Sequence, residues 1–162
     1  MSADRELIAS VQIAAPVEKV WAVLTDFGNL ADASPELVTM RPLLRGGLRV
    51  GQQYLGVNKR GRVYWPTTNV VVDLQPKRLL AWDTPLSGAR WIFELTEADG
   101  GTRLTQRRPV PRRLHPFGRL FAAALLGGGE GHADELEQAL GTTLTHLKAV
   151  AEAERDVIPA AP

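Results

Sequence analysis

The feature that most restricts the fold is a series of short strand-like segments between residues 36 and 108, each ended by turn-forming residues. The breaks contain glycine, proline or aspartate and recur at short intervals. This spacing is typical of an antiparallel meander, because parallel strands need long crossover connections. Six strands are predicted in this region: Leu37–Leu44, Gln52–Asn58, Val63–Leu74, Arg78–Asp83, Ala89–Thr96 and Thr102–Arg108.

The N-terminal part predicts one more strand and two short helices. Residues Glu6–Ile13 alternate between apolar and polar, as a half-buried strand does. Pro16 suits the first turn of a helix over Pro16–Thr25, whose apolar residues recur at helical spacing. The segment Asp26–Ser34 predicts a second short helix or structured turn, closed by Pro35.

A long C-terminal helix is predicted over Ala133–Ala153. Its apolar residues recur at steps of three and four, and acidic residues crowd its first turn, where the helix dipole favours them. Such a stripe needs an apolar partner, and one face of the predicted sheet supplies it. Residues 1–155 are therefore expected to form a single domain of the α+β class, followed by a flexible tail over 156–162.

Strand alternation predicts which side chains of the sheet face this helix. Val70, Val72, Trp91, Phe93 and Leu104 are assigned to the inner face. Because residues two apart share a face, Gln106 and Arg108 should point inward with Leu104. An inward polar pair costs free energy unless it finds partners. The alternative is that the register slips, or that Arg108 lies at the exposed rim of the sheet.

The segment Leu120–Leu126 predicts a short apolar helix between a basic stretch and the glycine run at 127–129. Three interpretations are open: a lid over an opening, a surface turn packed on the domain, or a contact with a second copy in a homodimer. At this length it is too short to span a bilayer, so no stable membrane insertion is expected.

Composition narrows the function classes. The net charge of +1 gives no general attraction to nucleic acid, and the lack of cysteine removes thiolate chemistry. His115, His132 and His146 lack metal-ligand spacing, and no phosphate-binding loop is present, so neither a metal nor another cofactor is predicted. The first residues lack the features of a signal peptide, which predicts a cytoplasmic protein.

The residues Ile13–Phe27 (IAAPVEKVWAVLTDF) resemble the N-terminal signature of the START-like, or SRPBCC, superfamily. Further matches to its bacterial polyketide cyclase/dehydrase branch follow in the same order: Gly51 with Gly56–Arg60, then Trp65–Thr68, Gln75-Pro76, Gly100–Thr105, and Leu144 with Leu147-Lys148. The resemblance implies a helix-grip fold. In this fold a seven-stranded curved antiparallel sheet surrounds a long C-terminal helix, with two short helices between strands 1 and 2.

The resemblance and the aromatic-rich inner face imply a cavity that binds a small, mostly hydrophobic molecule, lipid-like or polyketide-like. The aromatic side chains could equally fill the interior. The predicted ligand-binding residues are Tyr64, Val70, Val72, Trp82, Trp91, Phe93, Leu104, Gln106, Arg108, Leu136, Leu140 and Leu144.

The alternative function is an enzyme that resembles polyketide cyclases, in which pocket residues hold enolate and carbonyl oxygens during an aldol condensation or dehydration. The candidate catalytic residues are Tyr64, Gln106, Arg108 and His132, with Asn58 as a weaker candidate. The sequence offers no carboxylate that is clearly placed in the cavity.

Overall fold

The computed structural model describes residues 6–109 and 129–153, with the side chains of 129–133 left out of the description. The elements in chain order are β1 (Leu7–Ile13), α1 (Val17–Thr25), α2 (Phe27–Ala33), β2 (Leu37–Pro42), β3 (Gln53–Arg60), β4 (Val63–Gln75), β5 (Leu79–Thr84), β6 (Ala89–Ala98), β7 (Gly101–Arg108) and α4 (Gly129–Ala153). The predicted segments Leu120–Leu126 and 156–162 lie outside the described residues.

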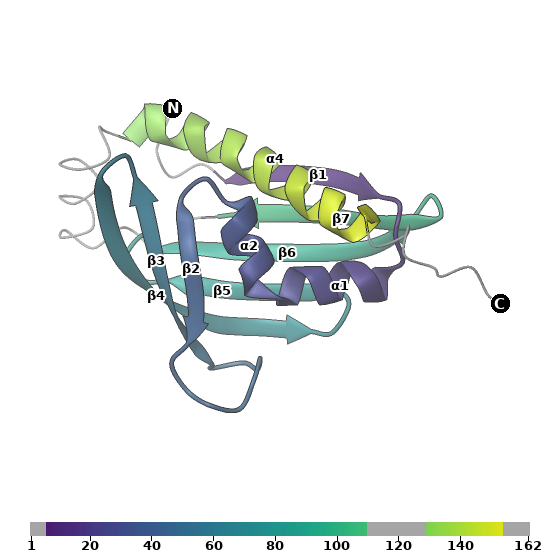
Figure 1. Ribbon diagram of the computed structural model, residues 1–162, viewed down its shortest axis with the longest axis horizontal. Helices are drawn as coiled ribbons and strands as arrows, with labels where there is room; N and C mark the ends of the chain where they lie inside the picture. The colour runs from purple at the N-terminus through teal and green to yellow at the C-terminus, as the bar shows by residue number, and fades with distance from the viewer. Residues whose placement is uncertain (1–5, 110–128, 154–162) are drawn as a thin grey trace.

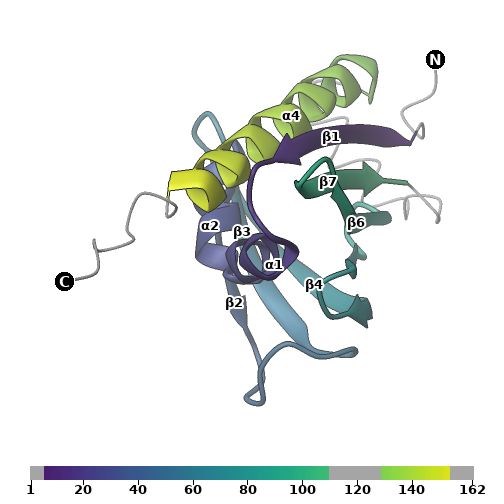
Figure 2. The same cartoon turned by 90° about the vertical axis from the view of Figure 1, so that its right-hand side faces the viewer.

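The seven strands form one antiparallel sheet in the order β1-β7-β6-β5-β4-β3-β2 (Figure 1). Each pair from β2 to β7 joins neighbours in sequence, as expected of a meander, and β1 closes against β7. Figure 2 shows the sheet curving around α1 and α2, with α4 on the same concave side. The helix-grip architecture predicted from the sequence is confirmed.

The C-terminal half of α4 is anchored to the end of β1. Leu144 and Leu147 are almost fully buried. The Lys148 ammonium donates a hydrogen bond to the carbonyl of Gln12 at 2.6 Å, and Glu152 Oε1 accepts one from the backbone N–H of Ala14 at 2.8 Å. The helix begins at Gly129, earlier than the predicted start at Ala133.

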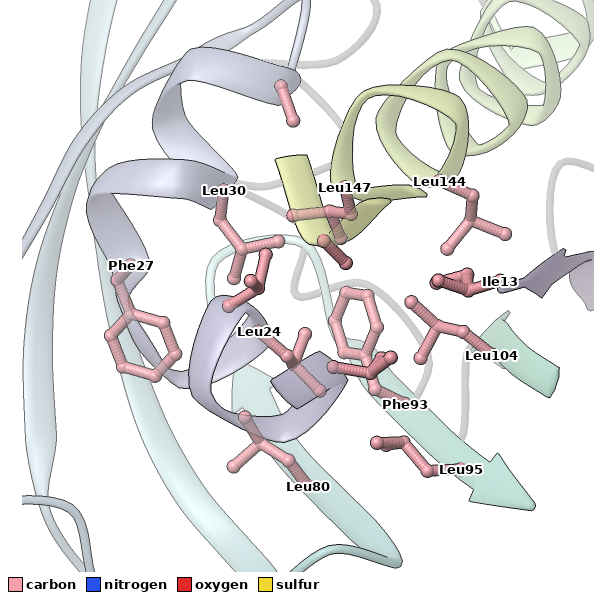
Figure 3. Close-up of a cluster of buried hydrophobic side chains, with 14 of the residues drawn as sticks. Ile13, Leu24, Phe27, Leu30, Leu80, Phe93, Leu95, Leu104, Leu144 and Leu147 are labelled. Carbon is pink, nitrogen blue, oxygen red and sulfur yellow. The ribbon is translucent and has the colours of Figure 1, made fainter. Parts of the chain in front are cut away.

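The main core lies between the sheet and helices α1, α2 and α4. Figure 3 shows its aliphatic and aromatic side chains converging from α1, α2, α4 and the strands. Phe93 is fully buried at its centre, and its ring stacks on Trp82 at a centroid distance of 5.4 Å. Phe27 at the start of α2 meets Trp82 edge-on, and Asp26 caps that helix by accepting a hydrogen bond from the Gly28 N–H. These contacts hold α2 against the sheet.

The assignment of Val70 and Val72 to the inner face is wrong. Val71 is the buried residue, at 1% exposure, while both flanking valines are only half-buried. The register shifts between Val71 and Asp73, so a bulge separates Val71 from Leu74, which also packs on the core. If residues are assigned to alternate faces from Leu74 back toward Val70, the bulge is missed, and Val70 and Val72 are placed on the inner face instead of Val71.

The same bulge places Tyr64 on the outer face. Its side chain is 57% exposed, and the Lys59 ammonium lies 5.2 Å from its ring centre. Tyr64 therefore lies on the face of the sheet turned away from α4, apart from the other predicted ligand-binding residues. The neighbouring residue Trp65 lies opposite the inward-facing Asn58.

Candidate functional site

The inner face carries two polar side chains where β1, β6 and β7 meet. The register pairs Gln106 with both Ala9 and Phe93, and pairs Arg108 with Leu7. Gln106 is 4% exposed. The alternation of β7 thus continues to its last residue without a slip, so both polar side chains point to the same side as Leu104.

Both side chains hold a buried atom without a hydrogen-bond partner: Gln106 Oε1 and Arg108 Nε. Buried polar groups in folded proteins are nearly always paired, so each such atom needs an explanation. Burial lowers the pKa of Arg108 to about 10, and the nearby Glu36 carboxylate opposes that shift. The guanidinium therefore remains positively charged at neutral pH.

The surroundings of this pair are apolar. The Arg108 guanidinium lies over the Trp91 ring, 5.2 Å from its centre, which is a cation–π contact. Leu7, Leu136 and Leu140 form a hydrophobic cluster separate from the main core, and Trp91 packs against it. We call these five residues together with Gln106 the β7 site. It combines an apolar surface with an unpaired donor and an unpaired acceptor.

Glu36, immediately before β2, adds a carboxyl group close to Arg108. Burial raises the pKa of Glu36, the positive charges of Arg60 and Arg108 oppose this, and Glu135 adds to it. Arg60 at the end of β3 forms an ion pair with Glu135 of α4. Four charged groups, from the residue before β2 and from β3, β7 and α4, thus influence one another at one end of the sheet.

A carboxyl group with a raised pKa makes a testable contribution to stability. The folded protein holds the Glu36 proton more tightly than the unfolded chain, so stability is lost as pH rises from 4.5 through the folded-state pKa. We expect the free energy of unfolding of the wild type to fall relative to that of Glu36→Gln across this window. Urea unfolding of both proteins at a series of pH values measures it, and a constant difference would contradict the assignment.

A second cluster of polar side chains on the inner face, formed by Asn58, Thr67, Asn69 and Thr84, is held by hydrogen bonds among its own members. Thr84 Oγ1 donates to Asn69 Oδ1 at 2.6 Å, and Asn58 Nδ2 donates to Thr67 Oγ1 at 3.0 Å. Gly56 makes room for it, because a Cβ there would lie 2.6 Å from Thr67 Oγ1. Asn58, the weaker catalytic candidate, is thus occupied in holding the β3–β4 pair together, which sets it apart from Gln106 and Arg108.

The structure divides the remaining predicted site residues into two groups. Trp91, Leu136 and Leu140 lie at the β7 site. Trp82, Phe93, Leu104 and Leu144 lie in the main core, with exposures between 0% and 6%. The side chain of His132 lies outside the described residues, although its backbone belongs to α4.

An open groove of about 640 Å³ lies elsewhere, between the start of α1, the β4–β5 turn and the end of β6. An ion pair between Lys77 and Glu18, 3.5 Å long, joins two of its walls. Its lining is mixed and largely charged, with Arg78, Glu94 and Glu97 among its residues. It therefore does not match the apolar cavity expected between the sheet and the C-terminal helix.

Two further properties concern only the described residues, 6–109 and 129–153. They contain no group of three or more histidine, aspartate or glutamate side chains that could hold a metal ion. None of their helices is long and apolar enough to cross a membrane.

Comparison with known proteins assigns the chain to a family. A family model described as polyketide cyclase/dehydrase and lipid transport matches residues 5–152. The chain belongs to this family. The match covers every described element up to the last residue but one of α4, so the β7 site lies wholly inside the family region. No curated protein sequence is similar enough to count as a match.

Several solved structures have a fold similar to that of this chain. The Zhui aromatase/cyclase from Streptomyces sp. R1128 is 22% identical, with a TM-score of 0.71 over 97% of this chain and 99% of that one. A polyketide cyclase-like protein from Corynebacterium glutamicum is 23% identical, with a TM-score of 0.63 over 100% and 99%. The Aha1 dimer from Colwellia psychrerythraea is 15% identical, with a TM-score of 0.60 over 91% and 96%. At these identities the likeness establishes the fold.

Proposed function

We propose that the protein binds a small, mostly hydrophobic molecule at the β7 site, with its apolar body against the Leu7, Leu136 and Leu140 cluster and its polar end at Arg108 and Gln106. The observation that carries this proposal is the pair of unpartnered buried atoms, Gln106 Oε1 and Arg108 Nε. A polar group left unpaired away from water costs about 1–3 kcal/mol. A bound ligand recovers that cost.

The chemistry of the two atoms restricts the polar end of the ligand. Arg108 Nε is a donor and requires an acceptor oxygen, while Gln106 Oε1 is an acceptor and requires a donor. A carboxylate, enolate or carbonyl oxygen beside a hydroxyl group meets both requirements. The positive charge of Arg108 favours an anionic oxygen. Lipid-like and polyketide-like molecules, the two classes suggested by the family description, both carry such groups.

A displacement assay tests the proposal. The dye 1-anilinonaphthalene-8-sulfonate should fluoresce on binding the wild-type protein, and fatty acids, 3-hydroxy fatty acids and hydroxylated aromatic acids should displace it. Fatty-acid methyl esters are the matched control, because they keep the apolar body and lose the charge. The proposal is wrong if no member of the panel displaces the dye, or if acids and esters compete equally well.

The second candidate function is catalysis of a cyclisation or dehydration, and the observation that favours it is Glu36. A carboxyl group whose pKa is raised by burial is a stronger base than an ordinary glutamate and can serve in proton transfer, and its neighbour Arg108 can stabilise an enolate oxygen. Glu36 would act as the acid or base, and Arg108 as the oxyanion partner. If this is correct, Glu36→Gln keeps the affinity for the acid of the panel and removes turnover of a poly-β-keto thioester analogue. Equal turnover by both proteins would refute the enzymatic role.

A further inference from the structure

The basic residues are distributed very unevenly along the chain. The segment 37–72 contains six arginine and lysine residues and no aspartate or glutamate, while the whole chain has a net charge of only +1. The residues outside this segment therefore carry a net charge of −5. This segment forms β2, β3, most of β4 and their connections. The β2 edge of the sheet is thus rich in basic residues, although the net charge of the whole chain is close to zero.

The loop between β2 and β3, residues 43–52, combines this charge with exposed aliphatic side chains. Leu43, Leu44 and Val50 are 50%, 55% and 58% exposed. Three exposed arginines are interspersed with them along the chain: Arg41 near the end of β2, and Arg45 and Arg49 in the loop. Figures 1 and 2 show the loop projecting from the body of the molecule, away from α4.

The loop is held in this shape by hydrogen bonds at its base. Gln52, fully buried, donates from Nε2 to the Leu44 carbonyl at 2.6 Å. The Gly51 N–H donates to the carbonyl of Val71 on β4 at 2.8 Å. The Arg49 guanidinium donates to the Arg45 carbonyl at 3.1 Å. The fold therefore holds the side chains of Leu43 and Leu44 exposed to water. This exposure of apolar surface costs free energy, and a partner that covers the two side chains would recover it.

We propose that the β2–β3 loop docks the protein on the surface of a membrane rich in anionic lipids. Leu43, Leu44 and Val50 enter the boundary between headgroups and acyl chains, and the arginines contact lipid phosphates. Such an interface suits a loop that carries both kinds of side chain, because its acyl chains accept the aliphatic groups and its phosphates attract the cationic ones. Docking of this kind is peripheral and needs no membrane-spanning helix.

Charge complementarity favours an anionic bilayer over two other partners that the loop could contact, a second copy of the chain and nucleic acid. A second copy of the chain would bring the same arginines together across a two-fold axis, where they repel. Nucleic acid would satisfy the arginines, but its phosphate backbone offers no apolar surface for Leu43, Leu44 and Val50. Of these three surfaces, the anionic bilayer is the one that satisfies both the arginines and the aliphatic side chains.

Vesicle co-sedimentation of the full chain tests the proposal, with phosphatidylcholine vesicles compared to vesicles in which a third of the lipid is phosphatidylserine. We expect binding to the anionic vesicles that weakens with salt. Arg41→Gln with Arg45→Gln should reduce the partition coefficient about twenty-five-fold, because each basic residue near an anionic surface contributes about fivefold. Leu44→Ser should reduce it about tenfold, through lost insertion of an apolar side chain.

Matched controls separate the loop from general effects. Arg62→Gln with Arg103→Gln removes the same charge at exposed positions outside the loop, and Ile8→Ser removes an aliphatic side chain that is 51% exposed. Both should bind anionic vesicles like the wild type, and all variants should keep the wild-type urea midpoint. The proposal fails if the wild type stays in the supernatant, if the controls lose as much binding as the loop variants, or if the loop variants instead lose self-association or RNA binding.

Discussion

Arg108→Met is expected to raise the free energy of unfolding of the ligand-free protein by about 2 kcal/mol, because it removes a charge that burial disfavours more than the Glu36 carboxylate favours it, and keeps a side chain of similar length. Burial has already lowered the pKa of Arg108 to about 10, which shows that the charged form is disfavoured in the fold. The methionine can still pack on Trp91, as Arg108 does at 5.2 Å. Urea unfolding of the two proteins measures the difference.

The same substitution should weaken binding of an acidic ligand about a hundredfold, since it removes a charge-assisted hydrogen bond from a largely buried guanidinium. Methyl esters should lose much less. Arg103→Met is the matched control, because Arg103 lies on the same strand but is exposed on the outer face. It should change neither stability nor affinity appreciably. A stabilised variant with full affinity for acids would show that Arg108 is not the ligand contact.

Gly101→Ala should lower the free energy of unfolding by about 3 kcal/mol, as overpacking against fixed backbone does. A Cβ at Gly101 would lie 2.2 Å from the carbonyl oxygen of Ile13. That oxygen cannot move easily, because the next residue of β7, Thr102, donates a hydrogen bond from Oγ1 to the carbonyl of Ala15 at 2.9 Å. Gly101 thus permits the close contact between β7 and the connection from β1 to α1.

Gly100→Ala is the control for this prediction. Gly100 has a φ of +73° and no atom within 4 Å of an added Cβ, so only the left-handed backbone conformation opposes the change. It should cost about 1–2 kcal/mol. Thermal and urea unfolding of both variants give the comparison. If Gly101→Ala destabilises the protein no more than Gly100→Ala does, the close contact with the Ile13 carbonyl is not what makes glycine necessary at position 101.

Most of the architecture was predictable because it depends on local patterns. The alternation of Trp91, Phe93 and Leu95 on β6 gives the correct inner face, and the apolar stripe of α4 gives its buried side. The β4 face was mispredicted because nothing in the valine run Val70–Val72 indicates where a bulge falls. A bulge is set by pairing with β5, which is a property of the assembled sheet.

The β7 site was partly predictable for the same reason. Gln106 and Arg108 follow from the parity of a single strand, whereas Glu36 approaches Arg108 only after the whole sheet has curved. No local pattern around Pro35 and Glu36 indicates that approach. The net charge of the whole chain likewise gave no sign of the basic β2–β3 loop, because the acidic residues that balance its arginines lie in other parts of the fold.

The measurement that tests the account most directly is the NMR resonance of the Arg108 Nε–H group, assigned by its absence from Arg108→Met. The resonance should shift strongly when the tightest-binding acid of the displacement panel is added, because Nε gains the acceptor it lacks in the free protein. The methyl ester of that acid should shift it little. An unchanged Arg108 resonance at saturating acid would contradict the proposed binding site.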